Sequence, residues 1–214
     1  MTLLFSPDSV FLQRFLTCGG YYKGDLDGLV GPKTMAALQE FQADTARVAD
    51  ELGKFEPRTE DNIGRLLPGT QRSARKFMSA ALKKGVLSDG LIPKIISGTR
   101  TYAEQNDIFA QGRTRPGKIV TNARAGQSNH NFGIAWDVGI FTAEGKYIDD
   151  LVDAKKMTSK SVDAEYKKLG ALGKTLGLFW GGDWSKPDFP HFQMLDNDLL
   201  ADVRNKFVSG SVIV

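Results

Sequence analysis

The segment from Ser128 to Asp137 constrains this chain most, because it holds one of only two histidines among 214 residues. It reads S-N-H-N-F-G-I-A-W-D, and the second histidine, His191, lies in P-D-F-P-H-F-Q. A lone histidine is more often a hydrogen-bonded structural residue than a ligand. Two histidines that each lie near an acid favour a metal site, because neutral imidazole and carboxylate are common zinc ligands in proteins.

The spacing of His130 and Asp137 predicts a turn followed by a strand. The two residues lie seven positions apart, and an odd offset places side chains on opposite faces of one continuous strand. A turn through Gly133 that leads into the strand I-A-W-D-V-G-I-F removes this conflict. We therefore expect Asp137 near the middle of a strand and His130 in the turn before it.

The pattern S-x-H-x-x-x-x-x-x-D followed by D-x-x-H resembles one family of zinc peptidases. That family contains D-Ala-D-Ala dipeptidases and carboxypeptidases and the L-alanyl-D-glutamate endopeptidases of bacteriophage lysins. The resemblance implies that zinc is the cofactor and that His130, Asp137 and His191 bind it. It also implies that Asp188 is the general base, and it matches Arg100 in S-G-T-R to an arginine of the family.

Three protein ligands leave one zinc position open for water, as in a catalytic rather than a structural site. A carboxylate must then accept a proton from this water and pass it to the leaving amine. Asp188 fits the D-x-x-H motif, and Asp183 in W-G-G-D-W is the alternative acid, which otherwise orients a ligand or a loop. The common H-E-x-x-H design of zinc proteases is excluded, because the sequence lacks it.

Two further residues each have two interpretations. Arg100 either donates hydrogen bonds to an oxyanion or a substrate carboxylate, or forms an ordinary surface ion pair. Ser128 either binds substrate or caps the turn. The chain between Asp107 and Asp137 raises a similar question, because it has no acid and is either a solvated face or a rim that attracts substrate carboxylates. Its basic residues are Arg113, Arg115, Lys118 and Arg124.

The first 45 residues carry a second resemblance. The stretch L-Q-R-F-L-x-x-G-G-Y-Y-x-G-D-L-D-G-L-V-G-P-K-T-M-A-A-L-Q-E-F-Q is similar to the three-helix peptidoglycan-binding module attached to many cell-wall hydrolases. The hydrophobic positions and glycines are equally what a small helical domain needs for folding alone. The resemblance therefore implies bacterial peptidoglycan as a partner, with a spacer that no longer binds as the alternative.

These patterns predict an α+β protein with a small N-terminal three-helix module and a zinc peptidase domain that has a mostly antiparallel sheet. The expected division is a module at 1–50, a linker at 51–69 and a peptidase domain at 70–214. Ser6-Pro7 predicts the start of the first helix. If the parts are independent, removal of residues 1–45 leaves cleavage of a soluble stem peptide nearly intact.

Composition describes an ordinary globular protein, with 41% hydrophobic and 25% charged residues. The single cysteine, Cys18, excludes an internal disulfide and a cysteine zinc site. Residues 1–60 carry more acidic than basic side chains, whereas residues 61–214 are basic, which suits an anionic polymer such as the cell wall. No nucleic-acid signature occurs, so we expect no nucleic-acid partner.

The N-terminal M-T-L-L-F-S-P-D lacks the pattern of a signal peptide, and no apolar stretch is long enough for a transmembrane helix. We therefore expect a monomer without stable membrane insertion that is made in the cytoplasm. It would reach the periplasmic cell wall by release during phage lysis or by delivery through a secretion system.

The sequence favours a bacteriolytic, endolysin-like peptidoglycan hydrolase that cleaves the stem peptide between L-alanine and D-glutamate. D-x-P-H-F-Q with W-G-G-D-W resembles the endopeptidase branch of the family more than the carboxypeptidase branch. The alternatives are a D-alanyl-D-alanine carboxypeptidase and, from another class, a cell-wall-binding protein with a catalytically dead peptidase domain.

Overall fold

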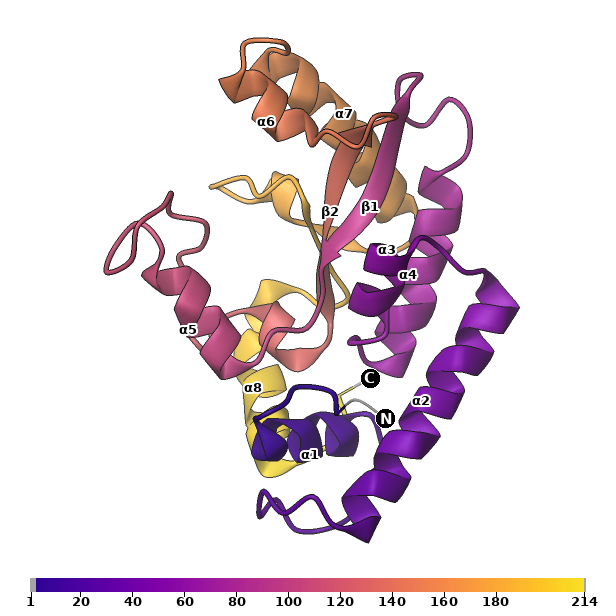
Figure 1. Cartoon of the computed structure of the whole chain (residues 1–214), viewed down its shortest axis with the longest axis vertical. Helices are drawn as coiled ribbons and strands as arrows, with labels where there is room; N and C mark the ends of the chain where they lie inside the picture. The colour runs from indigo at the N-terminus through magenta and orange to yellow at the C-terminus, as the bar shows by residue number, and fades with distance from the viewer. Residues whose placement is uncertain (1–2, 214) are drawn as a thin grey trace.

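The computed structural model describes residues 3–213 and contains a four-stranded sheet flanked by helices (Figure 1). The sheet order is β1-β2-β4-β3, and all of its pairings are antiparallel. The strands are β1 (Leu91–Ser97), β2 (Ala135–Thr142), β3 (Phe179–Trp180) and β4 (His191–Gln193). The predicted α+β class with an antiparallel sheet is therefore confirmed.

Eight helices longer than a single turn surround this sheet in the described part of the chain. They are α1 (Ser9–Cys18), α2 (Pro32–Leu52), α3 (Pro57–Ile63), α4 (Pro68–Ala81), α5 (Tyr102–Ala110), α6 (Ile148–Asp153), α7 (Ser159–Thr175) and α8 (Leu200–Ser209). Short 3-10 turns precede β2, β4 and α8. None of these helices is both long and apolar enough to cross a membrane.

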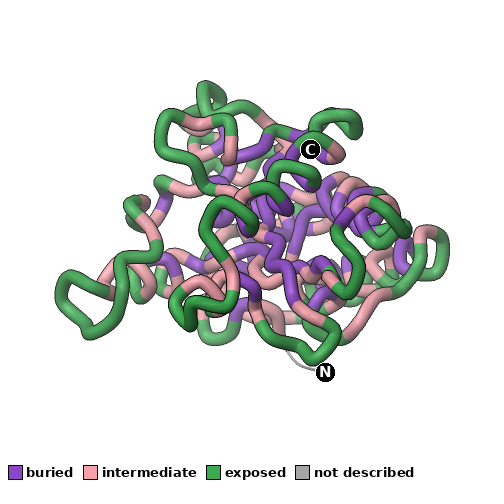
Figure 2. The backbone as a smooth tube through the Cα atoms, turned by 90° about the horizontal axis from the view of Figure 1, so that it is seen from above, coloured by how far each residue is buried: buried purple, intermediate pink, exposed green. Residues whose placement is uncertain are grey.

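Strand β2 separates an apolar core from an open polar face. Trp136, Val138 and Ile140 are fully buried and pack against α4 and α7 through residues such as Phe77 and Leu169. Because side chains alternate along a strand, the residues between them face the other side of the sheet. The buried backbone segments gather in the centre of the molecule (Figure 2), and the open face of β2 carries the site described below.

The N-terminal helices share a second hydrophobic cluster with the rest of the chain. Phe15 of α1 is fully buried against Phe41 of α2, with a ring-centroid separation of 5.4 Å. Figure 1 shows α1 beside α8, and the cluster includes residues from well beyond the N-terminal module. These later members are Leu67, Phe132, Ile134, Val203 and Phe207.

The two parts pack closely at Gly133. Its φ of +72° favours glycine, and a Cβ at this position would lie 2.8 Å from a Phe15 ring carbon and 2.9 Å from Leu67 Cγ. The Leu67 N–H also donates to the Gly133 carbonyl at 2.9 Å. The N-terminal module therefore packs against the turn that carries His130.

Two local expectations need correction. The first helix begins at Ser9 rather than at Ser6-Pro7, because the Asp8 side chain accepts the hydrogen bond of the Phe11 N–H and caps it. Independence of residues 1–45 also conflicts with the shared cluster, because their removal would uncover buried apolar residues next to the histidine turn.

The ranges 1–50, 51–69 and 70–214 stay predictions, but the middle one is not a loose connection. All of α3 lies within it and packs along β1. The Ile95 N–H donates to Thr59 Oγ1 at 3.0 Å, and Asn62 Nδ2 donates to the Ile95 carbonyl at 3.2 Å. Residues 57–63 therefore support the first strand of the sheet.

Phe15→Ala tests whether the module and the peptidase fold as one unit. A large buried aromatic side chain replaced by alanine costs about 3–5 kcal/mol, so we expect a loss of this size in the free energy of unfolding. Urea denaturation followed by tryptophan fluorescence measures it, because all three tryptophans lie in the peptidase part. Leu29→Ala is the control, since Leu29 is 71% exposed. An unchanged tryptophan transition in Phe15→Ala would show that the two parts unfold independently.

Candidate active site

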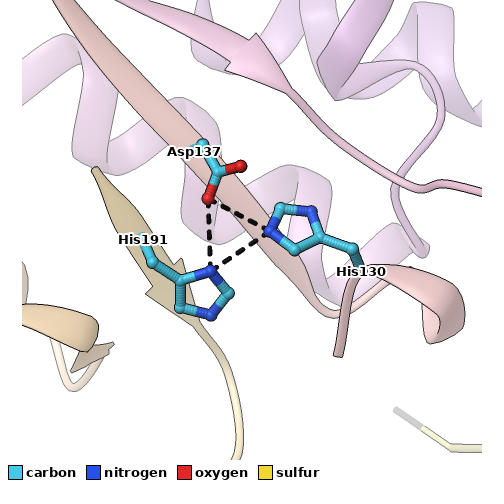
Figure 3. A group of neighbouring side chains, drawn as sticks. All are labelled: His130, Asp137 and His191. Carbon is cyan, nitrogen blue, oxygen red and sulfur yellow. Dashed lines mark hydrogen bonds and ion pairs between the residues drawn. The ribbon is translucent and has the colours of Figure 1, made fainter. Parts of the chain in front are cut away.

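Three separate elements bring His130, Asp137 and His191 together on the open face of the sheet (Figure 3). His130 lies in the 3-10 turn Asn129–Phe132, and Asp137 lies on β2. His191 begins β4 directly opposite Asp137 in the antiparallel register. The predicted turn followed by a strand therefore brings His130 and Asp137 together.

One potential ligand atom from each residue points at the same spot. Asp137 Oδ1 lies 3.1 Å from His130 Nε2 and 3.2 Å from His191 Nδ1, and the two nitrogens lie 3.1 Å apart. A tetrahedral zinc ion with bonds of about 2.0–2.2 Å separates its ligand atoms by about 3.3 Å. The spacing and the donor types therefore fit a zinc ion held by these three residues.

Hydrogen bonds on the far side of each imidazole select the tautomer that can bind a metal. His130 Nδ1 lies 2.7 Å from the Gly98 carbonyl, which can only accept, so this nitrogen carries the proton and Nε2 keeps its lone pair. His191 Nε2 donates to Gln193 Oε1 at 2.8 Å, which leaves Nδ1 free. Both histidines are almost fully buried.

Gln193 is itself fixed by neighbouring amides. Its Nε2 donates to the Leu195 carbonyl at 2.7 Å, which leaves Oε1 as the acceptor facing His191. Asn129 Nδ2 donates both to Gln193 Oε1 at 2.9 Å and to Asn197 Oδ1 at 3.0 Å. Sequence reasoning missed this network, although Gln193 follows His191 by two positions and so shares its face of β4.

Burial and charge favour the ligand forms of His130 and Asp137, whereas the pKa of His191 is raised, because the Asp137 carboxylate outweighs the lowering effect of burial. Burial, followed by the positive charge of Arg100, lowers the pKa of His130 to about 4, so its imidazole is neutral near pH 7. Burial opposes the charge of Asp137, but the two histidines outweigh it and hold the pKa of this carboxyl well below its usual range. The site therefore offers a neutral imidazole and an anionic carboxylate.

Arg100 lies against the second oxygen of Asp137. Its Nη1 is 3.5 Å from Asp137 Oδ2 and donates to Ser97 Oγ at 2.9 Å, while Nε donates to Gln105 Oε1 at 3.0 Å. The Arg100 N–H also donates to the His130 carbonyl at 3.0 Å. This is a partly buried position beside the metal ligands rather than an ordinary surface ion pair.

The two candidate acids lie in different surroundings. Asp183 is half exposed and binds Lys174, with contacts of 2.9 and 3.1 Å to the ammonium group. Asp188 has no such partner within residues 3–213. Desolvation, followed by the negative charge of Asp137, raises the pKa of Asp188. The His191 N–H donates to the Asp188 carbonyl at 3.2 Å, and a Cβ added at Gly181 would lie 2.9 Å from His191 Cβ and 3.2 Å from Asp188 Cβ, so the two side chains start close together.

The structure also bears on Ser128 and the basic loop. Ser128 Oγ accepts the hydrogen bond of the His130 N–H at 3.3 Å, so the capping interpretation describes its contact. In the loop, Arg115 pairs with Asp107 at 3.0 Å and Lys118 pairs with Asp153 at 2.7 Å. These exposed pairs describe a solvated face.

Comparison with known proteins places these residues in a family. Residues 121–194 match the D-alanyl-D-alanine carboxypeptidase family of peptidases (M15), and residues 6–59 match the peptidoglycan binding domain. The chain is also 38% identical over 118 residues to the peptidoglycan L-alanyl-D-glutamate endopeptidase CwlK of Bacillus subtilis (strain 168). That alignment covers 55% of this chain and 69% of the relative. The chain belongs to the M15 peptidase family.

Membership makes the chain an enzyme, a zinc-dependent metallopeptidase, and the cluster at His130 is where its residues can hold the metal. The alternative of a dead wall-binding protein is therefore wrong. The peptidoglycan binding domain supports peptidoglycan as a partner and confirms the resemblance on which the N-terminal module was predicted.

Replacement of a ligand and of its support should have different effects on zinc binding. His191→Ala removes one of three ligands, so we expect loss of stoichiometric zinc. Gln193→Leu removes only the acceptor that orients His191, and such outer contacts are typically worth about 10–100-fold in metal affinity. Competition with a chromogenic zinc chelator measures both, with Asn122→Leu as an exposed control. Wild-type affinity in Gln193→Leu would contradict the supporting role.

Proposed function

We propose that this enzyme hydrolyses the bond between L-alanine and D-glutamate in peptidoglycan stem peptides. The observation that carries a hydrolytic function is the convergence of three ligand atoms of His130, Asp137 and His191 within about 3.2 Å of one another. The choice of bond is supported by the printed activity of the Bacillus subtilis relative.

In this proposal His130, Asp137 and His191 hold the zinc ion. When bound, zinc polarises the scissile carbonyl and lowers the pKa of a coordinated water to about 7. Gly98 and Gln193 keep the far nitrogens of the two imidazoles protonated, so that the near nitrogens stay available. Ser128 fixes the turn of His130 by capping it, and a direct contact with substrate is the second role proposed for it.

Asp188 is the proposed general base. Its carboxylate accepts a proton from the attacking water and delivers it to the nitrogen of the leaving D-glutamyl residue. A raised pKa suits this task, because a base works best when its pKa approaches the pH at which the enzyme operates. Asp183 is less suited, since Lys174 already occupies its carboxylate.

Arg100 is the proposed electrostatic partner of the substrate. Ser97 and Gln105 hold its guanidinium group beside Asp137, which limits its movement. A fixed donor of this kind stabilises either the oxyanion that develops on the scissile carbonyl or a neighbouring substrate carboxylate.

The D-alanyl-D-alanine carboxypeptidase alternative keeps support from the description of the matched family. Mass spectrometry of digested peptidoglycan separates the two activities. We expect fragments with new N-terminal D-glutamate and new C-terminal L-alanine. Release of free D-alanine without these termini would identify a carboxypeptidase and overturn the proposed bond.

Wall binding by the N-terminal module and action in the periplasmic cell wall belong to the same proposal, because the proposed substrate lies there. A monomeric, endolysin-like enzyme released by phage lysis fits this setting, as does delivery by a secretion system. Pull-down with purified cell walls tests the binding role of the module in the folded full-length protein.

Asp188→Asn and Asp183→Asn together test the assignment of the base. The amide keeps the size of Asp188 but cannot accept a proton, so we expect turnover to fall by about 10²–10⁴-fold while zinc stays bound. Asp183→Asn removes only an exposed ion pair, so its turnover should change less than about threefold. An inactive, zinc-loaded Asp183→Asn beside an active Asp188→Asn would reverse the two roles.

A further inference from the structure

The open face of the sheet carries a second feature, a pocket of about 560 Å³ near the end of β2 and α6. Its wall combines apolar and charged side chains: Ile96, Phe141, Tyr147, Arg58, Lys146 and Asp150. None of the three metal ligands lines it. The pocket is therefore distinct from the catalytic cluster, and the roles proposed above leave it unused.

Strand geometry connects this pocket to the metal ligands. Asp137 and Phe141 lie four positions apart on β2, so they share one face and are separated by about 13 Å at about 3.3 Å per residue. On the neighbouring strand, Ser97 pairs with Asp137 and the adjacent Ile96 lines the pocket. A group of the substrate about 13 Å from the bond cleaved at the cluster, including the end of a long side chain, can therefore reach the pocket.

The apolar side of the pocket is closely packed. A Cβ at Gly139 would lie 2.9 Å from a Phe141 ring carbon and 3.1 Å from a Tyr147 ring carbon, so both rings lie directly on the strand. The two rings are 5.3 Å apart, and the Tyr147 hydroxyl shares a hydrogen bond with Tyr166 at 3.1 Å. This surface suits an aliphatic chain.

The charged side of the pocket has unpaired groups of both signs. Arg58, Lys146 and Asp150 are exposed, and none of them forms an ion pair within residues 3–213. The Arg58 guanidinium carbon lies 5.8 Å from the centre of the Phe141 ring. The pocket therefore offers donors for a carboxylate and one carboxylate for an amine, together with an apolar wall.

We propose that this pocket binds a diamino acid residue of the stem peptide, with its carboxylate at Arg58 and Lys146 and its free amine at Asp150. The aliphatic chain of that residue would pack on Phe141 and Tyr147. The inference rests on the proposed function and deepens it, because it makes the pocket a specificity site on the D-glutamate side of the cleaved bond. Carboxylates of the stem peptide occur only on that side.

Three synthetic stem peptides test the proposal, one with a free diamino acid, one with its side-chain amine acetylated and one with its carboxylate amidated. We expect each modification to raise KM about tenfold in the wild-type enzyme, as loss of a charged hydrogen bond would. Asp150→Asn should remove the effect of acetylation alone, and the double replacement Arg58→Gln with Lys146→Gln the effect of amidation alone. The kcat values should stay unchanged, because the zinc cluster is untouched.

Lys84→Gln and Asp89→Asn are the matched controls, since both residues are exposed and lie outside the pocket. They should keep the wild-type ratios of KM. The proposal is overturned if either modification leaves the wild-type KM unchanged, or if its effect persists in the matching variant. Absence of cleavage of all three peptides would instead overturn the proposed function.

Discussion

An imidazole can offer a metal only one of its nitrogens while the other carries a proton, and the structure of this protein depends on fixing which one. The Gly98 carbonyl and the Gln193 amide make that choice for the two histidines. The Gln193 amide is in turn held by the Leu195 carbonyl and the Asn129 amide. Such outer contacts orient metal ligands and tune their basicity, so the site extends well beyond its three ligands.

The support of this site reaches back to α3. Arg75 is fully buried and binds both oxygens of Glu60 at 2.7 and 2.8 Å, which fixes α3 against α4. In turn, α3 pairs with β1 through Thr59 and Asn62. Gly98 directly follows β1, and its carbonyl accepts the hydrogen bond of His130 Nδ1. A segment whose sequence predicts a linker is thus part of the chain of contacts that orients a proposed zinc ligand.

The sequence predicts the three clustering residues because histidine is rare in it and the H-x-x-x-x-x-x-D and D-x-x-H patterns are specific. The α+β class with an antiparallel sheet is equally predictable from the sequence. The contacts of Gly98 with His130 and of Phe15 with Gly133 cannot be predicted in this way, because they join residues that lie far apart in the chain. Periodicity indicates which face of a helix is buried, but it does not identify what covers that face.

The shared hydrophobic cluster packs the N-terminal module directly against the peptidase part of the chain. An enzyme that is joined to its binding module by a flexible linker can reach every bond within the length of that linker. Here the packing of Phe15 and Leu67 against Gly133 takes the place of such a flexible linker. A molecule anchored to the wall through α1 and α2 would therefore reach only those stem peptides that lie at a fixed distance from its point of attachment.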